Sequence, residues 1–313
     1  MNSVHVHPSM MNRPPQEPIG HAGGEAVEAD DAGVQVLDMP IGGLLRHAMT
    51  LTDEQVERVL KYQREHRLRF GEAAVALKLA TDDDVVWALS QQFHYPYALG
   101  STALHPELVA ATSPFSDEAE GFRELRAQLL MGVLAPGEAR RAVAVVSPDT
   151  GDGKSYLAAN TAVAFSQLGG RTLLLDADMR TPRLQTLFGI PPGVSGLSSI
   201  LVGRAETNVI RPVRDLPSLY VLPVGESPPN PQELVQRPAF SLLIKELLTK
   251  FDHVVVDTPA ASHGADARVI AAVCGAAVMV GRQGRSRMDA MGALLKGLSK
   301  SRCKLAGVVM NEY

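Results

Sequence analysis

Aromatic residues and cysteine are both scarce in this sequence of 313 residues. Phe, Trp and Tyr together make up 5% of the chain, which is too little for the stacked aromatic surfaces that bind single-stranded nucleic acid. The two cysteines, Cys274 and Cys303, belong to no spacing typical of metal ligands and cannot form a disulfide framework. A reducing, cytoplasmic location is the simplest interpretation.

Long hydrophobic runs and an excess of basic charge are missing too. The longest uncharged apolar run, residues 269–281, has 13 residues, whereas about 20 are needed to span a bilayer. No secretory signal pattern opens the chain, so we expect any membrane association to come through a partner. The formal net charge is -4, and residues 1–40 hold six acids and one base, so no region is basic enough to predict nucleic acid as a partner.

Composition and an internal repeat divide the chain into four parts. Residues 1–39 mix Pro, Gly, Ala, His and acids without periodicity, which predicts a disordered tail. From Pro40 the sequence duplicates itself with a period of 29 residues, and each copy contains a short helix, an N-cap at Thr52 or Thr81, and a longer amphipathic helix. We therefore predict a helical repeat module over 40–98, a linker over 99–115 and a second domain over 116–313.

The second domain alternates short strands rich in Val and Leu with helical stretches. This pattern is typical of the α/β class, with a mainly parallel sheet covered by helices on both faces. The sequence RAVAVVSPDTGDGKS at 141–155 gives an apolar strand, a Gly-containing loop and a helix from Ser155 to Leu168, in the order of a phosphate-binding P-loop. The motif departs from its strict form at Pro148, where glycine is usual.

The P-loop residues predict a nucleotide site. Gly151 and Gly153 allow main-chain N–H groups to converge on phosphate oxygens. Lys154 can neutralise phosphate charge, and Ser155 can ligate Mg²⁺ at the start of the helix. The expected nucleotide contacts in this stretch are Thr150, Gly151, Asp152, Gly153, Lys154, Ser155 and Tyr156.

Three acids follow at the ends of predicted strands. Asp176 and Asp178 come after the buried strand 173–175, and residues two apart on a strand face the same way, so both carboxylates are expected at the carboxyl edge of the sheet. Asp257 ends a third apolar strand, as the aspartates that reach Mg²⁺ in P-loop proteins do. Each acid alone could be a solvated strand end or a helix cap, but three in this order after a P-loop predict a site for ATP and Mg²⁺.

With these motifs, residues 116–313 resemble the bacterial tyrosine kinases (BY-kinases), which are P-loop proteins related to MinD and ParA. The resemblance rests on SPDTGDGKS, LLLDADMR and VVVDTPA, and on a Glu-x-x-Arg-x-x-Arg pattern at Glu120, Arg123 and Arg126. Together with the helical repeat, the chain is similar to the EpsG-type chain-length-determinant kinases of exopolysaccharide clusters. The resemblance implies an ATP-dependent autokinase that regulates exopolysaccharide polymerisation, chain length and export, held at the inner membrane by a membrane chain-length determinant.

The resemblance also implies a role for each site residue. Lys154 holds the transferred phosphate. Ser155 and Asp257 bind Mg²⁺, and Asp178 reaches the metal directly or through water. Asp176 accepts the proton of the tyrosine hydroxyl, whose pKa near 10 makes it a poor nucleophile on its own.

Two further matches have a plain alternative. Asn311 matches the adenine-contacting Asn of related ATPases, or it caps the end of a strand. Glu120, Arg123 and Arg126 lie on one helical stripe, which joins subunits into a ring in the family but is also a common form of charged surface. The family usually carries a C-terminal tyrosine cluster, whereas the tyrosines here are scattered and the sequence ends at Tyr313, so the phosphorylated tyrosine and the size of the assembly stay open.

The helical repeat is similar to MshEN-type domains, some of which bind cyclic di-GMP. The second copy keeps the leading pattern from Arg69 to Gly71, whereas the first copy has Pro40 in place of the arginine. Met49 and Lys78 stand where the family has glycine. The module is therefore either a cyclic di-GMP site or a packed docking module without a ligand.

Two other functions remain open. A MinD/ParA-type positioning ATPase carries a signature lysine five residues before the P-loop lysine, where this sequence has Asp149, and a terminal amphipathic membrane helix, which we do not expect here. A non-catalytic adaptor that binds ATP and gates polysaccharide export would use every residue above, except that Asp176 would not act as a base.

Overall fold

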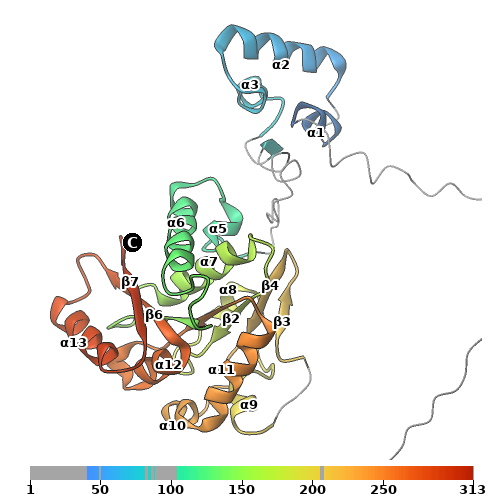
Figure 1. The fold of residues 1–313 in the computed structure, drawn as a ribbon. Helices are drawn as coiled ribbons and strands as arrows, with labels where there is room; N and C mark the ends of the chain where they lie inside the picture. Colours follow the sequence, from blue (N-terminus) through green and yellow to red (C-terminus); the bar gives the residue numbers. More distant parts are fainter. Residues whose placement is uncertain are drawn as a thin grey trace, which may run out of the picture. The chain divides into compact units, whose positions relative to one another are not determined.

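The computed structural model describes residues 41–48, 51–81, 84–85, 88, 104–204 and 208–312 (Figure 1). The predicted tail over 1–39, most of the long helix predicted in the second repeat, and Tyr313 lie outside these ranges. Within the ranges described, no helix combines the length and the apolar character that crossing a bilayer requires.

Capped helices form the repeat module. Thr52 Oγ1 accepts the main-chain N–H of Gln55 at 3.3 Å, and the Gln55 side chain accepts the N–H of Thr52 at 2.9 Å. Thr81 and Asp84 make the same reciprocal pair at 3.2 and 2.7 Å, so the N-caps predicted for both copies are confirmed. The helices described in this module are α1 (Ile41–Ala48), α2 (Asp53–His66) and α3 (Phe70–Ala76).

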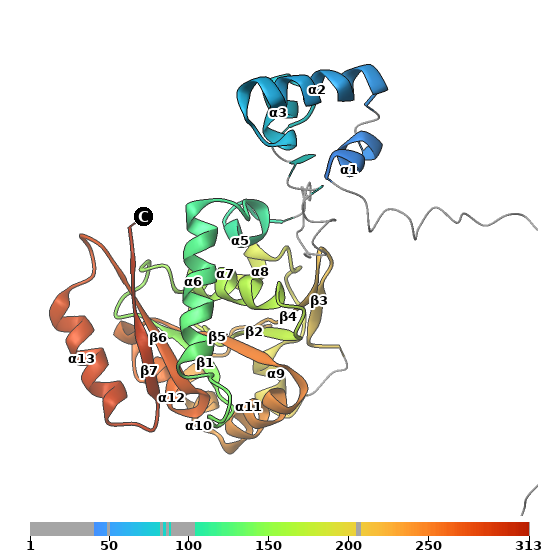
Figure 2. The ribbon, with the colours of Figure 1, turned by 45° about the horizontal axis from the view of Figure 1, so that its top comes forward.

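A seven-stranded sheet with the order β3-β4-β2-β5-β1-β6-β7 forms the centre of the P-loop domain (Figure 2). β3 runs antiparallel to β4, and every other neighbouring pair is parallel. The α/β class and the mainly parallel sheet are therefore confirmed. The strands are β1 (Ala142–Val146), β2 (Thr172–Asp176), β3 (Arg211–Val213), β4 (Leu216–Leu222), β5 (His253–Asp257), β6 (Gly275–Arg282) and β7 (Lys304–Asn311).

Successive residues of the central strands belong to two separate hydrophobic cores. Ala144 and Val146 of β1 contact one buried cluster, whereas Val143 and Val145 contact the other, because side chains alternate between the faces of a strand. Figure 2 shows helices over both faces of the sheet. One face is covered by α5 (Val109–Thr112), α6 (Asp117–Met131), α7 (Lys154–Ser166) and α8 (Leu184–Leu187), the other by α9 (Leu197–Leu201), α10 (Pro231–Gln236), α11 (Pro238–Lys250), α12 (Asp266–Cys274) and α13 (Met288–Ser299).

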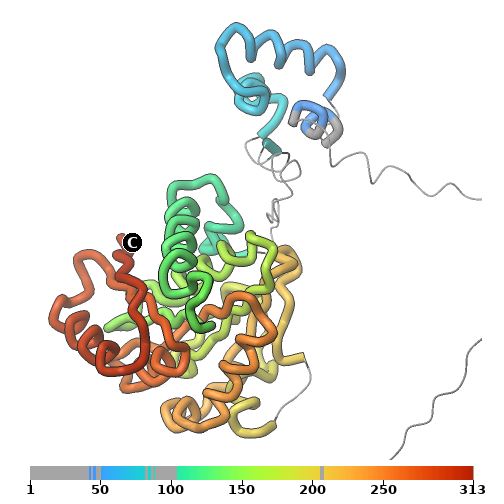
Figure 3. The backbone as a smooth tube through the Cα atoms, in the orientation of Figure 1, coloured from blue at the N-terminus to red at the C-terminus, as the bar shows by residue number. Residues whose placement is uncertain are grey.

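The segment that precedes α6 belongs to the P-loop domain. The sequence predicts a linker over 99–115, but Leu108, Ala110 and Ala111 are almost completely buried in the core that also contains residues of α6 and α7. The linker prediction is wrong for this stretch. Side chains of α7 bond to the main chain of the segment, and such contacts leave no periodic signal in the sequence of the segment. The tube in Figure 3 passes from this segment through a turn into α6.

Candidate active site

The P-loop connects the end of β1 to the start of α7. Gly151 and Gly153 have φ angles of +88° and +102°, in the left-handed region that favours glycine. A Cβ atom on Gly153 would overlap with the side-chain nitrogen of Asn311. The loop therefore needs glycine at this position for two reasons. α7 begins at Lys154, one residue earlier than predicted.

Asp152 organises the loop through its side chain. The residue is completely buried, and its carboxylate accepts the main-chain N–H of Asp149 at 2.8 Å and the hydroxyl of Ser286 at 2.7 Å. Ser286 follows β6, and its Oγ accepts the N–H of Arg282 at 2.7 Å. The carboxylate thus joins the P-loop to the end of a second strand. The main chain of Asp152 is the part that remains able to face a phosphate.

In the part of the chain that the structure describes, the hydrogen bonds of the Lys154 ammonium group are long. It is buried and donates to Ser147 Oγ at 3.2 Å and to the carbonyl of Asp149 at 3.4 Å. Hydrogen bonds from an ammonium group to a strong acceptor are shorter, at about 2.7–2.9 Å. The group therefore has donor capacity that a phosphate can use.

The three predicted acids meet at the carboxyl edge of the sheet. Asp176 and Asp257 end the neighbouring strands β2 and β5 and lie opposite each other in the register. Asp178 lies just beyond the end of β2, and its main-chain N–H donates to Asp176 Oδ1 at 3.0 Å. All three side chains are buried. The convergence expected from the sequence is present.

Asp178 is fixed by the turn that follows it. Its carboxylate accepts the N–H groups of Arg180 and Thr181 at 3.1 and 2.9 Å and the Thr181 hydroxyl at 2.9 Å. Arg180 in turn forms an ion pair with the buried Asp266 of α12 at 3.1 Å. Asp178 is thus a rigid carboxylate whose oxygens already have partners.

Burial changes the acid strength of the other two carboxyl groups. It raises the pKa of Asp176 well above its usual range, and the charges of Asp257 and Asp178 raise it further. The pKa of Asp257 is raised to about 7, mainly by burial, although the Ser155 hydroxyl and the Lys154 charge lower it. Both oxygens of Asp257 and Oδ2 of Asp176 are buried without a hydrogen bond of good geometry to any residue that the structure describes. These oxygens would be stabilised by a cation or a proton donor.

The donor set fits a Mg²⁺ ion shared with a phosphate. In the part of the chain that the structure describes, no three acidic, histidine or cysteine side chains gather as a cation cage. Mg²⁺ does not require one, because it usually keeps several waters and takes one or two carboxylates besides phosphate oxygens. Asp257, with the Ser155 hydroxyl beside it, can supply such a set.

Asn311 borders two clefts beside the P-loop. One cleft, of about 460 Å³, reaches from Gly151 and Tyr156 to Arg282. The other, of about 570 Å³, lies between α6 and β7. The Asn311 side chain donates to the carbonyl of Asp152 at 3.1 Å, so it joins β7 to the P-loop. Because Asn311 lines both clefts, the predicted contact with adenine stays a prediction beside this contact to the P-loop.

Several polar residues around the P-loop carry no role in the sequence prediction. His263 Nε2 lies 2.9 Å from the Thr150 hydroxyl, and Arg282 lies 3.4 Å from the carbonyl of Gly151. Arg282 ends the apolar strand β6, which is the signal that identified the aspartates and could have found it too. Glu107 lies in the stretch predicted as a linker, and no local pattern points to it.

The predicted self-association stripe on α6 makes contacts within the chain. Arg123 donates to Glu120 at 2.7 Å and to the carbonyl of Pro114 at 2.6 Å. Arg126 donates to the carbonyl of Ala164 in α7 at 2.6 Å. Both arginines therefore support the packing of α6, while the Glu120 side chain is 70% exposed.

Comparison with known proteins gives the class that this fold and site define. The sequence profile of the ParA family, described as NUBPL iron-transfer P-loop NTPase, matches residues 138–312. The matched residues include the P-loop, the three acids and Asn311. The class is therefore that of the ParA-type P-loop NTPases.

Individual relatives narrow this class. Tyrosine-protein kinase CpsD of Streptococcus agalactiae is 31% identical over 176 residues, which cover 56% of this chain and 77% of CpsD. Tyrosine-protein kinase YwqD of Bacillus subtilis is 32% identical over 204 residues, which cover 65% of this chain and 85% of YwqD. The solved chimerical protein CapA2B2 is 32% identical with a TM-score of 0.62 and covers 72% of this chain and 97% of its own. The chain belongs to the bacterial tyrosine-kinase family, so the predicted class, protein-tyrosine kinase, is confirmed.

Proposed function

We propose that this kinase transfers the γ-phosphoryl group of Mg²⁺-bound ATP to a tyrosine hydroxyl and so regulates exopolysaccharide polymerisation, chain length and export. The observation that carries the proposal is the meeting of the P-loop with three buried aspartates at one edge of the sheet. The tyrosine-protein kinases CpsD and YwqD, which are similar over this domain, support it.

Binding of the nucleotide depends on the P-loop and the start of α7. Main-chain N–H groups around Gly151 and Gly153 face the phosphates, and the Lys154 ammonium group exchanges its long contacts for phosphate oxygens. Ser155 and Asp257 hold Mg²⁺, which when bound neutralises the charge that develops on the phosphate oxygens. Asp178 acts through its charge or through water, because its oxygens accept hydrogen bonds from its own turn.

Asp176 is the proposed general base. The N–H of Asp178 orients Asp176 Oδ1, while Oδ2 is buried without a partner. The raised pKa of this carboxyl group brings it closer to the pKa of a tyrosine hydroxyl, near 10, than an ordinary aspartate would be. The proton of the attacking hydroxyl passes to this oxygen as the tyrosine oxygen bonds to phosphorus and the bond to the ADP oxygen breaks.

The test compares Asp176→Asn with Asp257→Asn in the full chain. Removal of a general base typically lowers the rate about 10²- to 10⁴-fold with little loss of ground-state binding. Asp176→Asn should therefore bind ATP with Mg²⁺ almost normally but transfer radiolabelled phosphate far more slowly. Asp257→Asn should instead lose the Mg²⁺ dependence of ATP binding. Equal phosphotyrosine yields from the wild type and Asp176→Asn would contradict the role of the base, and no transfer by the wild type would favour the non-catalytic adaptor.

The proposed partner is a membrane chain-length determinant, which holds the kinase at the cytoplasmic side of the inner membrane. Among the described residues no helix is suited to cross the bilayer. In this proposal the partner supplies the contact with the membrane. The solved relative CapA2B2 is described as a chimerical protein, which agrees with a kinase that works beside a second polypeptide.

Self-association through α6 is also part of the proposal. Glu120 is the exposed member of the stripe and would contact a neighbouring copy. Arg123 and Arg126 fix the position of α6, on which this contact depends.

Cyclic di-GMP is the ligand proposed for the repeat module. The second copy supports it, since Arg69 directly precedes α3 and Gly71 is packed so closely that a Cβ atom would lie 2.5 Å from Val85 Cγ1.

A further inference from the structure

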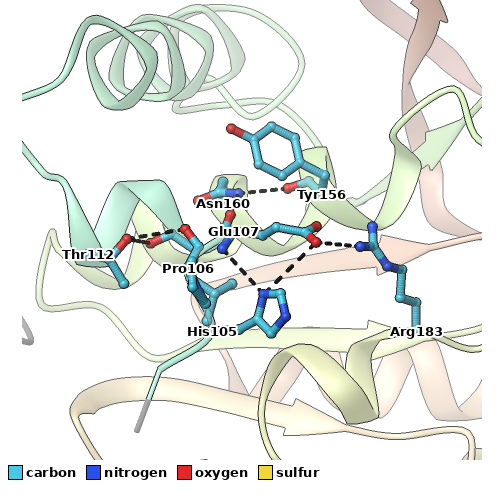
Figure 4. A network of polar contacts seen from close by, with 8 residues as sticks. His105, Pro106, Glu107, Thr112, Tyr156, Asn160 and Arg183 are labelled. Atoms are coloured by element: carbon cyan, nitrogen blue, oxygen red, sulfur yellow. Dashed lines mark hydrogen bonds and ion pairs between the residues drawn. The ribbon is translucent and has the colours of Figure 1, made fainter. Parts of the chain in front are cut away.

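A short segment before α6 is clamped onto α7, the helix that starts at the P-loop. The side chain of Asn160 accepts the N–H of Ala110 at 2.9 Å and donates to the carbonyl of Glu107 at 2.8 Å. Gln167, which directly follows α7, donates to the carbonyl of Ala110 at 2.7 Å. Asn160 is completely buried. The main chain of this segment is therefore fixed relative to the P-loop helix. Figure 4 shows Glu107 of the segment beside Asn160 and Tyr156 of that helix.

The clamp places the Glu107 side chain between two other groups. Oε1 accepts a hydrogen bond from Arg183 at 2.5 Å and lies 4.0 Å from Nδ1 of His105 (Figure 4). Arg183 belongs to the stretch that directly follows Asp176 and Asp178. The Arg183 guanidinium group thus orients the carboxylate, whereas His105 Nδ1 accepts the main-chain N–H of Glu107 at 3.3 Å. Among the residues that the structure describes, none donates a hydrogen bond to Oε2. The side chain is 34% exposed, so a ligand can reach it.

Glu107 and the P-loop border the same cleft. The cleft of about 460 Å³ is lined by Glu107, Gly151, Gly153, Tyr156 and Asn311. Two guanidinium groups, from Arg183 and Arg282, also line it. A nucleotide whose phosphates lie on the P-loop has its sugar a few bonds away, next to the first turn of α7. Residue 107 lies outside the residues 138–312 that the family profile matches.

We propose that Glu107 binds the ribose of the nucleotide, with Arg183 as the residue that positions its carboxylate. An ionised carboxylate only accepts hydrogen bonds, and the two adjacent hydroxyls of a ribose both donate. An acidic residue performs this task for dinucleotides in Rossmann folds, so the chemistry is general. The inference rests on the proposed function, because it requires ATP to bind at the P-loop.

The experiment measures the preference for ribose over deoxyribose. Isothermal titration calorimetry on the full chain with Mg²⁺ gives the affinities for ATP, 2′-deoxy-ATP and 3′-deoxy-ATP. We expect the wild type to bind ATP about tenfold or more tightly than either deoxy form, since a hydrogen bond to a charged group is lost. Glu107→Ala should bind ATP as weakly as the wild type binds the deoxy forms and should not distinguish the three ligands.

Two further variants separate the carboxylate from its surroundings. Arg183→Gln leaves the carboxylate but not its orientation, so it should show a smaller preference than the wild type. Glu118→Ala is the matched control, because the Glu118 carboxylate lines the same cleft but belongs to α6. This variant should keep the wild-type preference for ribose. Glu107→Ala keeps the main-chain clamp, and an unchanged thermal unfolding midpoint verifies that it folds.

The outcomes distinguish this inference from the proposed function. Equal affinity of the wild type for ATP and both deoxy forms, or an unchanged preference in Glu107→Ala, overturns the ribose contact while ATP binding stands. Loss of the preference in Glu118→Ala instead of Glu107→Ala assigns the ribose to the other carboxylate and also overturns it. Absence of any ATP binding by the wild type overturns the proposed function together with this inference.

Discussion

Gly153 lies where the P-loop, the start of α7 and the end of β7 come together. Its φ angle is +102°, and a Cβ atom at this position would overlap with the amide of Asn311. Gly153→Ala should lower the free energy of unfolding by about 1–3 kcal/mol and weaken ATP binding about tenfold or more, because the loop has to shift. Urea denaturation and isothermal titration calorimetry measure the two effects.

Gly137 offers a matched control for this substitution. It has a φ of +88°, but no other atom lies within 4 Å of the position of its Cβ. Gly137→Ala should therefore show the cost of backbone strain alone, with unchanged affinity for ATP. If Gly153→Ala bound ATP as tightly as the wild type, the close fit between this glycine and Asn311 would have no bearing on the nucleotide site.

At the same scale, the sequence predicts a residue's place only where a repeating pattern leads to it. Asp176 and Asp257 were predictable because each ends a buried apolar strand, and parallel strands bring such ends together. The hydrogen bond of the buried Asp152 carboxylate could not be predicted, since its partner Ser286 is 134 residues away in the chain. Glu107 could not be identified either, because its position depends on a clamp formed by α7.

Among the elements, the segment over residues 107–112, which contains α5, is held to α7 by the Asn160 side chain. Asn160 bonds to the main chain of Glu107, Ala110 and Tyr156. Asn160→Ala leaves several polar groups without partners, and each such group costs about 1–3 kcal/mol when buried, so we expect a loss of about 2–4 kcal/mol in the free energy of unfolding. Urea denaturation measures it.

An exposed amide on α6 gives the control for this change. Gln128 donates to Glu124 at 3.2 Å within the helix, and both residues are exposed. Gln128→Ala should change the free energy of unfolding by less than about 0.5 kcal/mol. Equal effects of the two substitutions would show that the segment is not held by the clamp.

The contacts of α6 change how its role in self-association is best tested. A substitution that reverses the charge of Arg123 would break its hydrogen bond to the carbonyl of Pro114 within the chain, so a loss of assembly could come from a change in α6 itself. Glu120→Lys changes an exposed residue, so the assembly formed with ATP should shift to monomer while the unfolding midpoint moves little. Light scattering measures the mass, and Glu124→Lys on the same helix is the control. Assembly that survives Glu120→Lys would make the stripe a support for α6 alone.

For the whole molecule, the buried acids link stability to pH. The pKa of Asp176 and that of Asp257 are higher in the fold than in an unfolded chain, where aspartate titrates near 3.9. The folded state therefore binds more protons than the unfolded state above that pH. The contribution of these groups is fully present below about pH 4 and is lost as the pH rises towards 7, the value to which the pKa of Asp257 is raised.

Thermal unfolding in the presence of a chelator tests this linkage. The unfolding midpoint of Asp257→Asn, relative to that of the wild type, should rise as the pH increases from about 4 to 7, because the variant has no charge to bury there. Asp289→Asn is the control, since Asp289 is an exposed acid whose pKa is lowered by Arg287. A difference between Asp257→Asn and the wild type that does not vary with pH would contradict the burial of this carboxyl group.

The general architecture of the catalytic domain followed from its sequence, because strands that are apolar on both faces require helices on both sides. The boundary of the domain could not be predicted from the sequence, since Ala110 and Ala111 are buried in a segment without an amphipathic period. The sequence pattern shows which elements form, whereas contacts between side chains and a distant main chain decide where a domain begins.

The two ends of the sheet differ in a way that limits how copies of this protein could add to one another. β3 is a strand of three residues that contains Pro212, so its free edge offers little for a further strand to pair with. β7 has eight residues, and Leu305, Val308 and Met310 are exposed along it. Growth of a fibre requires two different edges that fit each other, and of the two edges of the described sheet only that of β7 is receptive. Edge-to-edge joining of this sheet would therefore stop at a closed pair related by a twofold axis.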